Sequence, residues 1–140
     1  MSVFSKVELA DYLLVKAHEV YSDSLLLFEA GRYSSAANRL YYAIYHTVRA
    51  LFTIDEVIAK DGKKIKGHDQ VVGKFNHIYV HQNEVFPKAF ARFIKKAESL
   101  RVDGDYMDMV VVDSAELQGL IVEFPEFYGK VKEYVATQST

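Results

Sequence analysis

Residues 31–52, GRYSSAANRLYYAIYHTVRALF, decide the fold, because their periodicity predicts one long helix with two unlike halves. At about 100° per residue, one half of this helix collects alanines and branched apolar side chains. That half comprises Ala36, Ala37, Leu40, Ala43, Ile44, Thr47, Val48, Ala50 and Leu51, with Tyr41 at its border. Small alanines allow a neighbouring helix to approach closely, so we expect this half to face the core.

The opposite half of the predicted helix is aromatic and cationic, unlike a typical solvated face. It holds Asn38, Arg39, Tyr42, Tyr45, His46 and Arg49. Tyrosine and arginine are enriched at protein interfaces, and histidine with arginine can act on phosphate esters. We therefore expect this half to serve recognition, a subunit interface or chemistry.

The rest of the chain also predicts helices, because apolar residues recur at the 3.6-residue period and only two prolines occur. A capping box that starts at Ser5 begins the first helix, and Gly31 ends it. Ser34 or Ser35 then caps the second helix, which makes a tight antiparallel hairpin. Residues 1–140 contain no linker or repeat, so we expect a single all-α domain, an antiparallel bundle of four to five helices.

The second half of the chain predicts three more helices. The third runs from about 68 to 80, the fourth follows Pro87 and stops at the turn-rich residues 101–106, and the last follows a cap at Asp113. Pro125 should kink or split that last helix. The apolar stripe of the first helix is Leu9, Tyr12, Leu13, Ala17, Val20, Tyr21, Ser24, Leu25 and Phe28. The expected core of the bundle is Leu13, Tyr21, Leu40, Ile44, Leu51, Phe75, Phe93, Leu120, Ile121 and Phe124.

Composition narrows the possible functions. Half of the residues are apolar, ample for a buried core, and no cysteine is present, which excludes disulfides and thiolate metal sites. The absence of cysteine suits a cytoplasmic protein. The sequence has no signal-peptide pattern and no apolar run long enough to span a membrane. Because the net charge is −2, any contact with RNA has to use a local basic patch.

The organising helix resembles the second helix of HEPN-domain proteins, whose name stands for higher eukaryotes and prokaryotes nucleotide-binding. The similar residues are Gly31-Arg32-Tyr33, Ala36-Ala37-Asn38-Arg39, Tyr41-Tyr42-Ala43, His46 and Arg49-Ala50-Leu51. Gly67-His68 and the stretch from Arg101 to Tyr106 match one small prokaryotic subgroup, and the resemblance covers roughly residues 8–135. It implies a helical bundle of HEPN type and a biology linked to RNA or nucleotides.

Arg39 and His46 have the Arg-x6-His spacing of a motif that many HEPN ribonucleases use. Seven residues make about two helical turns, so both side chains share one face about 10 Å apart along the axis. Histidine can move the 2′-hydroxyl proton or protonate the leaving oxygen, and arginine can neutralise the phosphate. Two interpretations stay open: metal-independent RNA cleavage at Arg39 and His46, or an interface that also includes Tyr42 and Arg49.

In catalytic HEPN proteins the motif usually lies late in the chain. That region here holds Arg101, Asp105 and Tyr106, and no histidine follows Arg101. Arg101 can complement the dipole at a helix C-terminus and form an ion pair with Asp105, while Tyr106 can bury its ring. The three residues are therefore either structural or part of a ligand-binding site.

Two other groups of side chains carry weaker signals. Lys60, Lys63, Lys64 and Lys66 form a basic run in an expected exposed loop over residues 53–66, which is either a solvated connection or a rim that attracts phosphate. His77 and His81 have i, i+4 spacing, but no third ligand is nearby in the sequence. We expect neither a metal nor a cofactor.

The resemblance leads to three functional hypotheses. The first is a dimeric interaction module, the RNA- or nucleotide-linked component of a toxin–antitoxin-type pair with a minimal nucleotidyltransferase. The second is an RNase that uses Arg39 and His46. The third is a nucleotide or small-molecule sensor whose pocket lies beside Tyr42 and Tyr106. Each of them is compatible with a homodimer in the cytoplasm.

Overall fold

A computed structural model describes residues 4–57, 68–106 and 111–139 of the chain. Its elements are α1 (Lys6–Glu29), α2 (Tyr33–Ile54), α3 (His68–Phe75), the π-helix η1 (Asn76–Gln82), α4 (Lys88–Tyr106) and α5 (Ser114–Gln138). The described residues contain no strand. The expectation of an all-α antiparallel bundle is confirmed.

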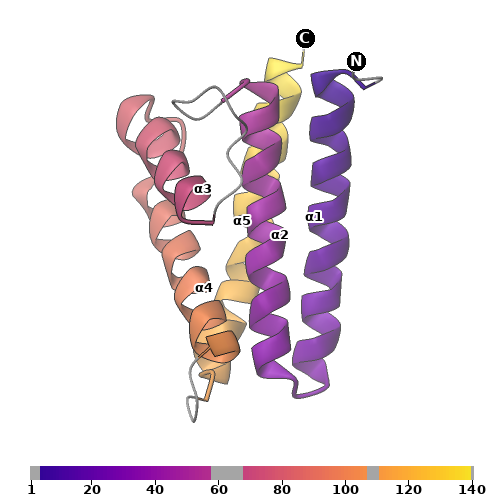
Figure 1. Ribbon diagram of the computed structural model, residues 1–140, viewed down its shortest axis with the longest axis vertical. Helices are drawn as coiled ribbons and strands as arrows, with labels where there is room; N and C mark the ends of the chain where they lie inside the picture. Colours follow the sequence, from indigo (N-terminus) through magenta and orange to yellow (C-terminus); the bar gives the residue numbers. More distant parts are fainter. Residues whose placement is uncertain (1–3, 58–67, 107–110, 140) are drawn as a thin grey trace.

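Helix α2 is the centre of the bundle. It packs against α1, α3, α4 and α5, and 13 of its 22 residues are buried. In Figure 1, α1 and α2 run antiparallel side by side, α4 and the α3–η1 segment lie on the other side of α2, and both termini lie at one end. The predicted organising helix is therefore correct, and it extends through residues 53 and 54, which were expected to form a loop.

The turn between α1 and α2 shows why the two helices form a tight hairpin. Gly31 has a φ of 75°, a left-handed conformation that glycine adopts without strain. The Gly31 amide donates to the Phe28 carbonyl (3.0 Å) and the Arg32 amide donates to the Leu27 carbonyl (2.8 Å), which is a Schellman motif. Helix α2 starts directly afterwards at Tyr33 with no side-chain cap, so the prediction of a serine cap is wrong.

Helix α1 begins at the predicted cap, where Ser5 Oγ accepts a hydrogen bond from the Glu8 amide (3.1 Å). Its buried stripe is displaced from the predicted one. Tyr12 (59% exposed) and Leu25 lie outside the core. The buried residues of α1 are Ala10, Leu13, Leu14, Ala17, Val20 and Ser24.

The predicted core is confirmed, because every predicted member is buried except Tyr21, which is half-buried. Two later helices differ from the predictions at their ends. The third helical segment continues to Gln82, and its last turns are π-helical. Helix α4 runs on to Tyr106 instead of stopping at Arg101, and an i, i+4 ion pair joins Arg101 to Asp105 at 3.5 Å.

Gly104 of α4 lies close to Ser34 at the start of α2. A Cβ atom at this position would lie 3.1 Å from Val112 and 3.2 Å from the Cβ atom of Ser34. A glycine therefore lets the two helix backbones approach closely at the lower end of the bundle. This approach holds Asp105 and Tyr106 beside the first turns of α2.

Helix α5 begins at the predicted cap, where Asp113 Oδ1 accepts from the amides of Ala115 (2.9 Å) and Glu116 (3.1 Å). Pro125 does not split it, since α5 is one helix from Ser114 to Gln138. Proline lacks the amide that would bond to the carbonyl four residues earlier, at Ile121. The Tyr21 hydroxyl of α1 donates to that carbonyl instead, at 2.8 Å.

This replacement bond can be tested with a double-mutant cycle. We expect Tyr21→Phe to lower the free energy of unfolding by about 1 kcal/mol, because it leaves the Ile121 carbonyl without a partner. In a Pro125→Ala background the new amide can reach that carbonyl, so Tyr21→Phe should cost less. Urea denaturation of the four proteins measures both costs, and equal costs in the two backgrounds would contradict this account.

The described helices include none that is long and apolar enough to cross a membrane. The basic run of Lys60, Lys63, Lys64 and Lys66 lies outside the described residues, as do residues 107–110.

Candidate functional site

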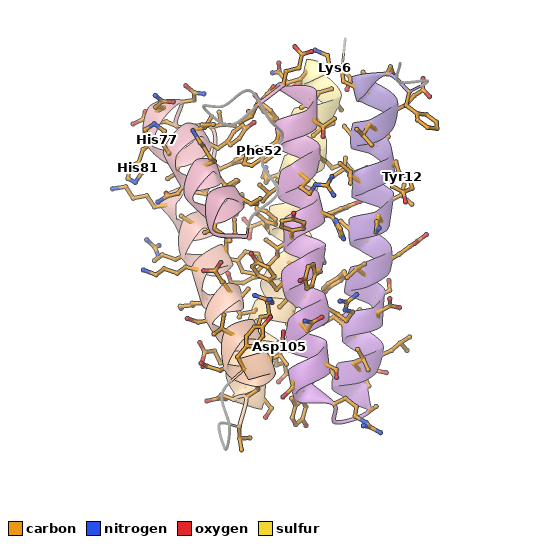
Figure 2. The ribbon with its side chains drawn as sticks, in the orientation of Figure 1. Lys6, Tyr12, Phe52, His77, His81 and Asp105 are labelled. Atoms are coloured by element: carbon orange, nitrogen blue, oxygen red, sulfur yellow. The ribbon has the colours of Figure 1, made fainter. Side chains whose placement is uncertain are left out.

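Helices α2 and α4 bring together five of the residues that the sequence singled out: Arg39 and Tyr42 from α2, with Arg101, Asp105 and Tyr106 from the end of α4. Figure 2 shows Asp105 at the end of α4, where that helix meets α2. Asn38 and Tyr41 of α2 lie among them, and we call these seven residues the tyrosine–arginine cluster. The close approach at Gly104 makes this meeting of the two helices possible.

Arg101 is the centre of the tyrosine–arginine cluster, with 8% of its surface exposed. Its guanidinium carbon lies 5.2 Å from the ring centroid of Tyr41, 5.7 Å from that of Tyr42 and 5.4 Å from that of Tyr106. Its Nη2 donates to the Tyr106 hydroxyl (3.1 Å). The 3.5 Å contact with Asp105 is an ion pair without hydrogen-bond geometry. Three aromatic rings and one carboxylate therefore offset the free-energy cost of removing this cation from water.

Asn38 links the residues that α2 contributes to the cluster with those that α4 contributes. Its Oδ1 accepts from Nε (3.1 Å) and Nη2 (2.7 Å) of Arg39, and its Nδ2 donates to Asp105 Oδ2 (2.9 Å). Arg39 also lies 5.2 Å from the ring centroid of Tyr42. A continuous polar chain thus runs from Arg39 through Asn38 and Asp105 to Arg101.

A pocket of about 710 Å³ opens beside this polar chain. It is lined by Leu27, Ser34, Ser35, Asn38, Arg39, Gly104, Asp105 and Tyr106. Its volume falls within the usual range for pockets that hold small ligands. Tyr106, 66% exposed, offers a ring for stacking, and the other lining side chains offer amide, guanidinium, hydroxyl and carboxylate groups.

Tyr41 and Asn38 were not predicted as site residues. Tyr41 sits on the border of the apolar half of α2, and its hydroxyl donates to Glu98 of α4 (3.5 Å). Burial, followed by the negative charge of Glu98, raises the pKa of Tyr41, so its hydroxyl stays protonated. The sequence signals for Asn38 were its place beside Arg39 on the polar half and its presence in the run Ala36-Ala37-Asn38-Arg39 that carries the family resemblance.

His46 lies apart from the pocket and is buried within its own chain, 9% exposed. Its ring centroid is 5.6 Å from that of Tyr45 and 6.5 Å from that of Tyr42. Burial, with the positive charges of Lys16, Arg49 and Arg39, lowers the pKa of His46 to about 4. Its Nδ1 has no hydrogen-bond partner among the described residues. At neutral pH His46 is therefore an uncharged imidazole among cations, and not the imidazolium that a general acid has to be.

The lowered pKa predicts a loss of stability in acid. Below about pH 6.5 the unfolded chain protonates His46 while the folded chain resists protonation down to about pH 4. We expect this residue to remove about 2–3 kcal/mol of unfolding free energy as the pH falls across that window. Urea denaturation of the parent and of His46→Gln at pH 7 and pH 4 isolates this contribution from that of the carboxylates. A pH effect that is the same in both proteins would contradict the prediction.

His77 and His81 both lie exposed on η1, at the end of the bundle far from the tyrosine–arginine cluster (Figure 2). Among the described residues, no group of three or more His, Asp or Glu side chains could hold a metal ion.

Comparisons with known proteins agree with this architecture. The family model of the HEPN domain matches residues 10–134. A Thermotoga maritima protein named "UPF0332 protein" is 28% identical over 130 residues, which cover 93% of each chain. Two Methanocaldococcus jannaschii proteins are named "Putative toxin MJ0142" (25% identical, covering 91% of this chain and 82% of the relative) and "Putative toxin MJ0605" (28%, covering 86% and 84%). No solved structure matches the chain significantly.

Proposed function

The chain belongs to the HEPN-domain family, and on that premise we propose that it is the RNA- or nucleotide-linked component of a toxin–antitoxin-type pair. In this proposal it is a single-domain cytoplasmic protein that acts as a dimeric interaction module, and its partner is a minimal nucleotidyltransferase. The word toxin in the names of two relatives supports the class of system.

The observation that carries the proposal is the tyrosine–arginine cluster with its adjoining pocket. Exposed Tyr106 can stack against a base, while Arg39 at the pocket wall can meet a phosphate. Interfaces are also rich in tyrosine and arginine, so the same surface suits a protein partner that handles nucleotides. Gly104 and Ser34, which lie close together where α4 meets α2, both line this pocket.

An interaction role fits His46 better than catalysis does. A ribonuclease needs its histidine within reach of the scissile phosphate and protonated for the acid step. His46 is buried, does not line the pocket and has a pKa lowered to about 4. The RNase alternative with Arg39 and His46 therefore requires a rearrangement that exposes this imidazole.

Co-expression tests the proposal. The chain should slow the growth of a bacterial host when expressed alone. We expect a gene beside it to encode a minimal nucleotidyltransferase, and that protein should relieve the effect and co-purify with the chain. Tyr106→Ala should weaken the complex at least several-fold, whereas the equally exposed Val122→Ala should not. If neither growth inhibition nor a complex is observed, the pairing is refuted.

Purified protein separates this role from RNA cleavage. The interaction module predicts that parent and His46→Ala leave a total RNA preparation equally intact. Cleavage by the parent that disappears in His46→Ala, with an unchanged circular dichroism spectrum, would instead favour the RNase alternative.

The proposed dimer leads to a separate prediction for the half of α2 that bears Arg39, Tyr42, His46 and Arg49. Tyr42 and Arg49 are half-buried within the chain, tyrosine and arginine are enriched at interfaces, and a two-fold dimer is the commonest soluble assembly. We expect Tyr42→Ala with Arg49→Ala to shift the protein towards monomer in sedimentation velocity. The matched pair Tyr12→Ala with Arg32→Ala, exposed on other surfaces, should sediment like the parent. If the two double variants sediment alike, this half of α2 is not the interface.

A further inference from the structure

The charge of the chain is unevenly distributed, and its basic part lies outside the tyrosine–arginine cluster. Residues 71–97 contain five Lys or Arg side chains and one acidic residue, Glu84, whereas the remaining residues contain 12 basic and 18 acidic ones. Although the net charge of the chain is −2, residues 71–97 are therefore strongly basic, in addition to the lysine run at 60–66 that lies outside the described residues. Residues 71–97 comprise the end of α3, η1 and the first half of α4.

Helix α4 gathers most of this charge on its outer face, which we call the basic stripe. The stripe consists of Lys88, Arg92, Lys95 and Lys96, all of them exposed. Their spacing puts them on the side of the helix opposite its buried residues, Phe90, Phe93, Ile94, Ala97 and Leu100. No ion pair joins any stripe residue to an acidic group in the described part of the chain. Figure 2 shows His77 and His81 of the neighbouring η1 on the side of the bundle away from α1.

We infer that the basic stripe of α4 binds the phosphate backbone of RNA, without reading its sequence. Lysine and arginine that meet phosphates supply the sequence-independent part of nucleic-acid affinity. Lys88 and Lys96 are eight residues apart, so the stripe is about 12 Å long and can span several phosphates of one strand. This inference rests on the RNA-linked part of the proposed function and assigns it a surface that the pocket does not include.

The chemistry of the stripe distinguishes RNA from other acidic partners. Protein interfaces are depleted of lysine and need a buried aromatic or aliphatic anchor at their centre. The outer face of α4 between Lys88 and Ser99 has no exposed large hydrophobic residue. An amphipathic helix at a membrane surface inserts its apolar face, but the apolar face of α4 is buried in the bundle. A row of cations without anchors fits a polyanion that is held by charge alone.

The same helix connects the basic stripe to the pocket. Helix α4 ends at the exposed Tyr106, ten residues and about 15 Å beyond Lys96. A single strand of RNA that is held along α4 therefore extends to the Tyr106 ring, on which one of its bases can stack. The stripe would supply affinity, and the pocket would supply the contact with a base or a terminal phosphate.

Fluorescence anisotropy with a labelled single-stranded RNA of mixed sequence, about 20 nucleotides long, tests the inference. The test variant is Arg92→Gln with Lys95→Gln and Lys96→Gln. Its matched control is Lys6→Gln with Lys130→Gln and Lys132→Gln, which changes the net charge equally through exposed lysines elsewhere. Circular dichroism and thermal denaturation confirm that each variant folds.

We expect the test variant to bind RNA about tenfold to a hundredfold more weakly than the parent, and the slope of log affinity against log salt to flatten by about 2. The control should change RNA affinity by no more than about threefold.

The inference would be overturned if the two variants lost RNA affinity equally, or if the parent did not bind RNA. A test variant that loses the nucleotidyltransferase complex while its RNA affinity is unchanged would also overturn it, because the stripe would then serve an acidic protein surface. Growth inhibition is measured separately, so the toxin proposal and the stripe can fail independently.

Discussion

Replacing Leu40 with alanine is expected to lower the free energy of unfolding by about 2–5 kcal/mol. Leu40 is 1% exposed and lies on the helix that packs against α1, α3, α4 and α5. The truncation removes apolar contacts and leaves a cavity that helices packed on several sides cannot easily fill. Urea denaturation of parent and variant measures the change.

The matched control is Leu26→Ala, the same chemical change at a side chain that is 66% exposed. Surface substitutions of this kind usually alter stability by less than about 0.5 kcal/mol. If the two variants shift the denaturation midpoint equally, Leu40 does not belong to the core that organises the bundle.

The Leu40 prediction was possible from the sequence because burial on a long helix follows a simple period. The apolar half of α2 needed only the 100° rotation per residue, and the ends of α1 and α5 needed only the caps at Ser5 and Asp113. Local signals failed where a contact between distant segments decided the outcome. Pro125 stays within one helix, and the Tyr21 hydroxyl bonds to the carbonyl that this proline leaves free.

The candidate site, like the fold, could be predicted from the sequence only in part. The resemblance singled out Arg39, Arg101 and Tyr106, yet their meeting depends on α4 continuing past Arg101, which the turn-rich sequence argued against. Asn38 became visible as a site residue only when α4 brought Asp105 to it. His46 is buried because α2 packs within the bundle, and one of the charges that lower its pKa belongs to Lys16 of α1. The sequence of α2 alone could therefore reveal neither the burial nor the lowered pKa.

Arg101→Ala is expected to lower the free energy of unfolding by about 3–5 kcal/mol, the range for removing one partner of a buried ion pair. The change leaves Asp105 without its cation and removes the cation that lies against the rings of Tyr41, Tyr42 and Tyr106. Arg101→Lys keeps the charge but loses the planar guanidinium, so it should recover only part of the stability. An Arg101→Ala variant as stable as the parent would show that this cation does not hold α4 to α2.

The stability of the variants does not decide whether the cluster also binds a ligand. Ligand binding is better tested at Tyr106, an exposed residue whose truncation the fold should tolerate. Tyr106 is 66% exposed, and Tyr106→Ala should cost no more than about 1 kcal/mol. If the pocket binds nucleotides, adenosine monophosphate or triphosphate should raise the melting temperature of the parent, and Tyr106→Ala should remove most of that rise by deleting the stacking ring. Val122→Ala, at a similarly exposed side chain that does not line the pocket, should keep the full rise. If neither nucleotide shifts the melting temperature of the parent, the pocket does not bind these nucleotides and the sensor hypothesis is refuted.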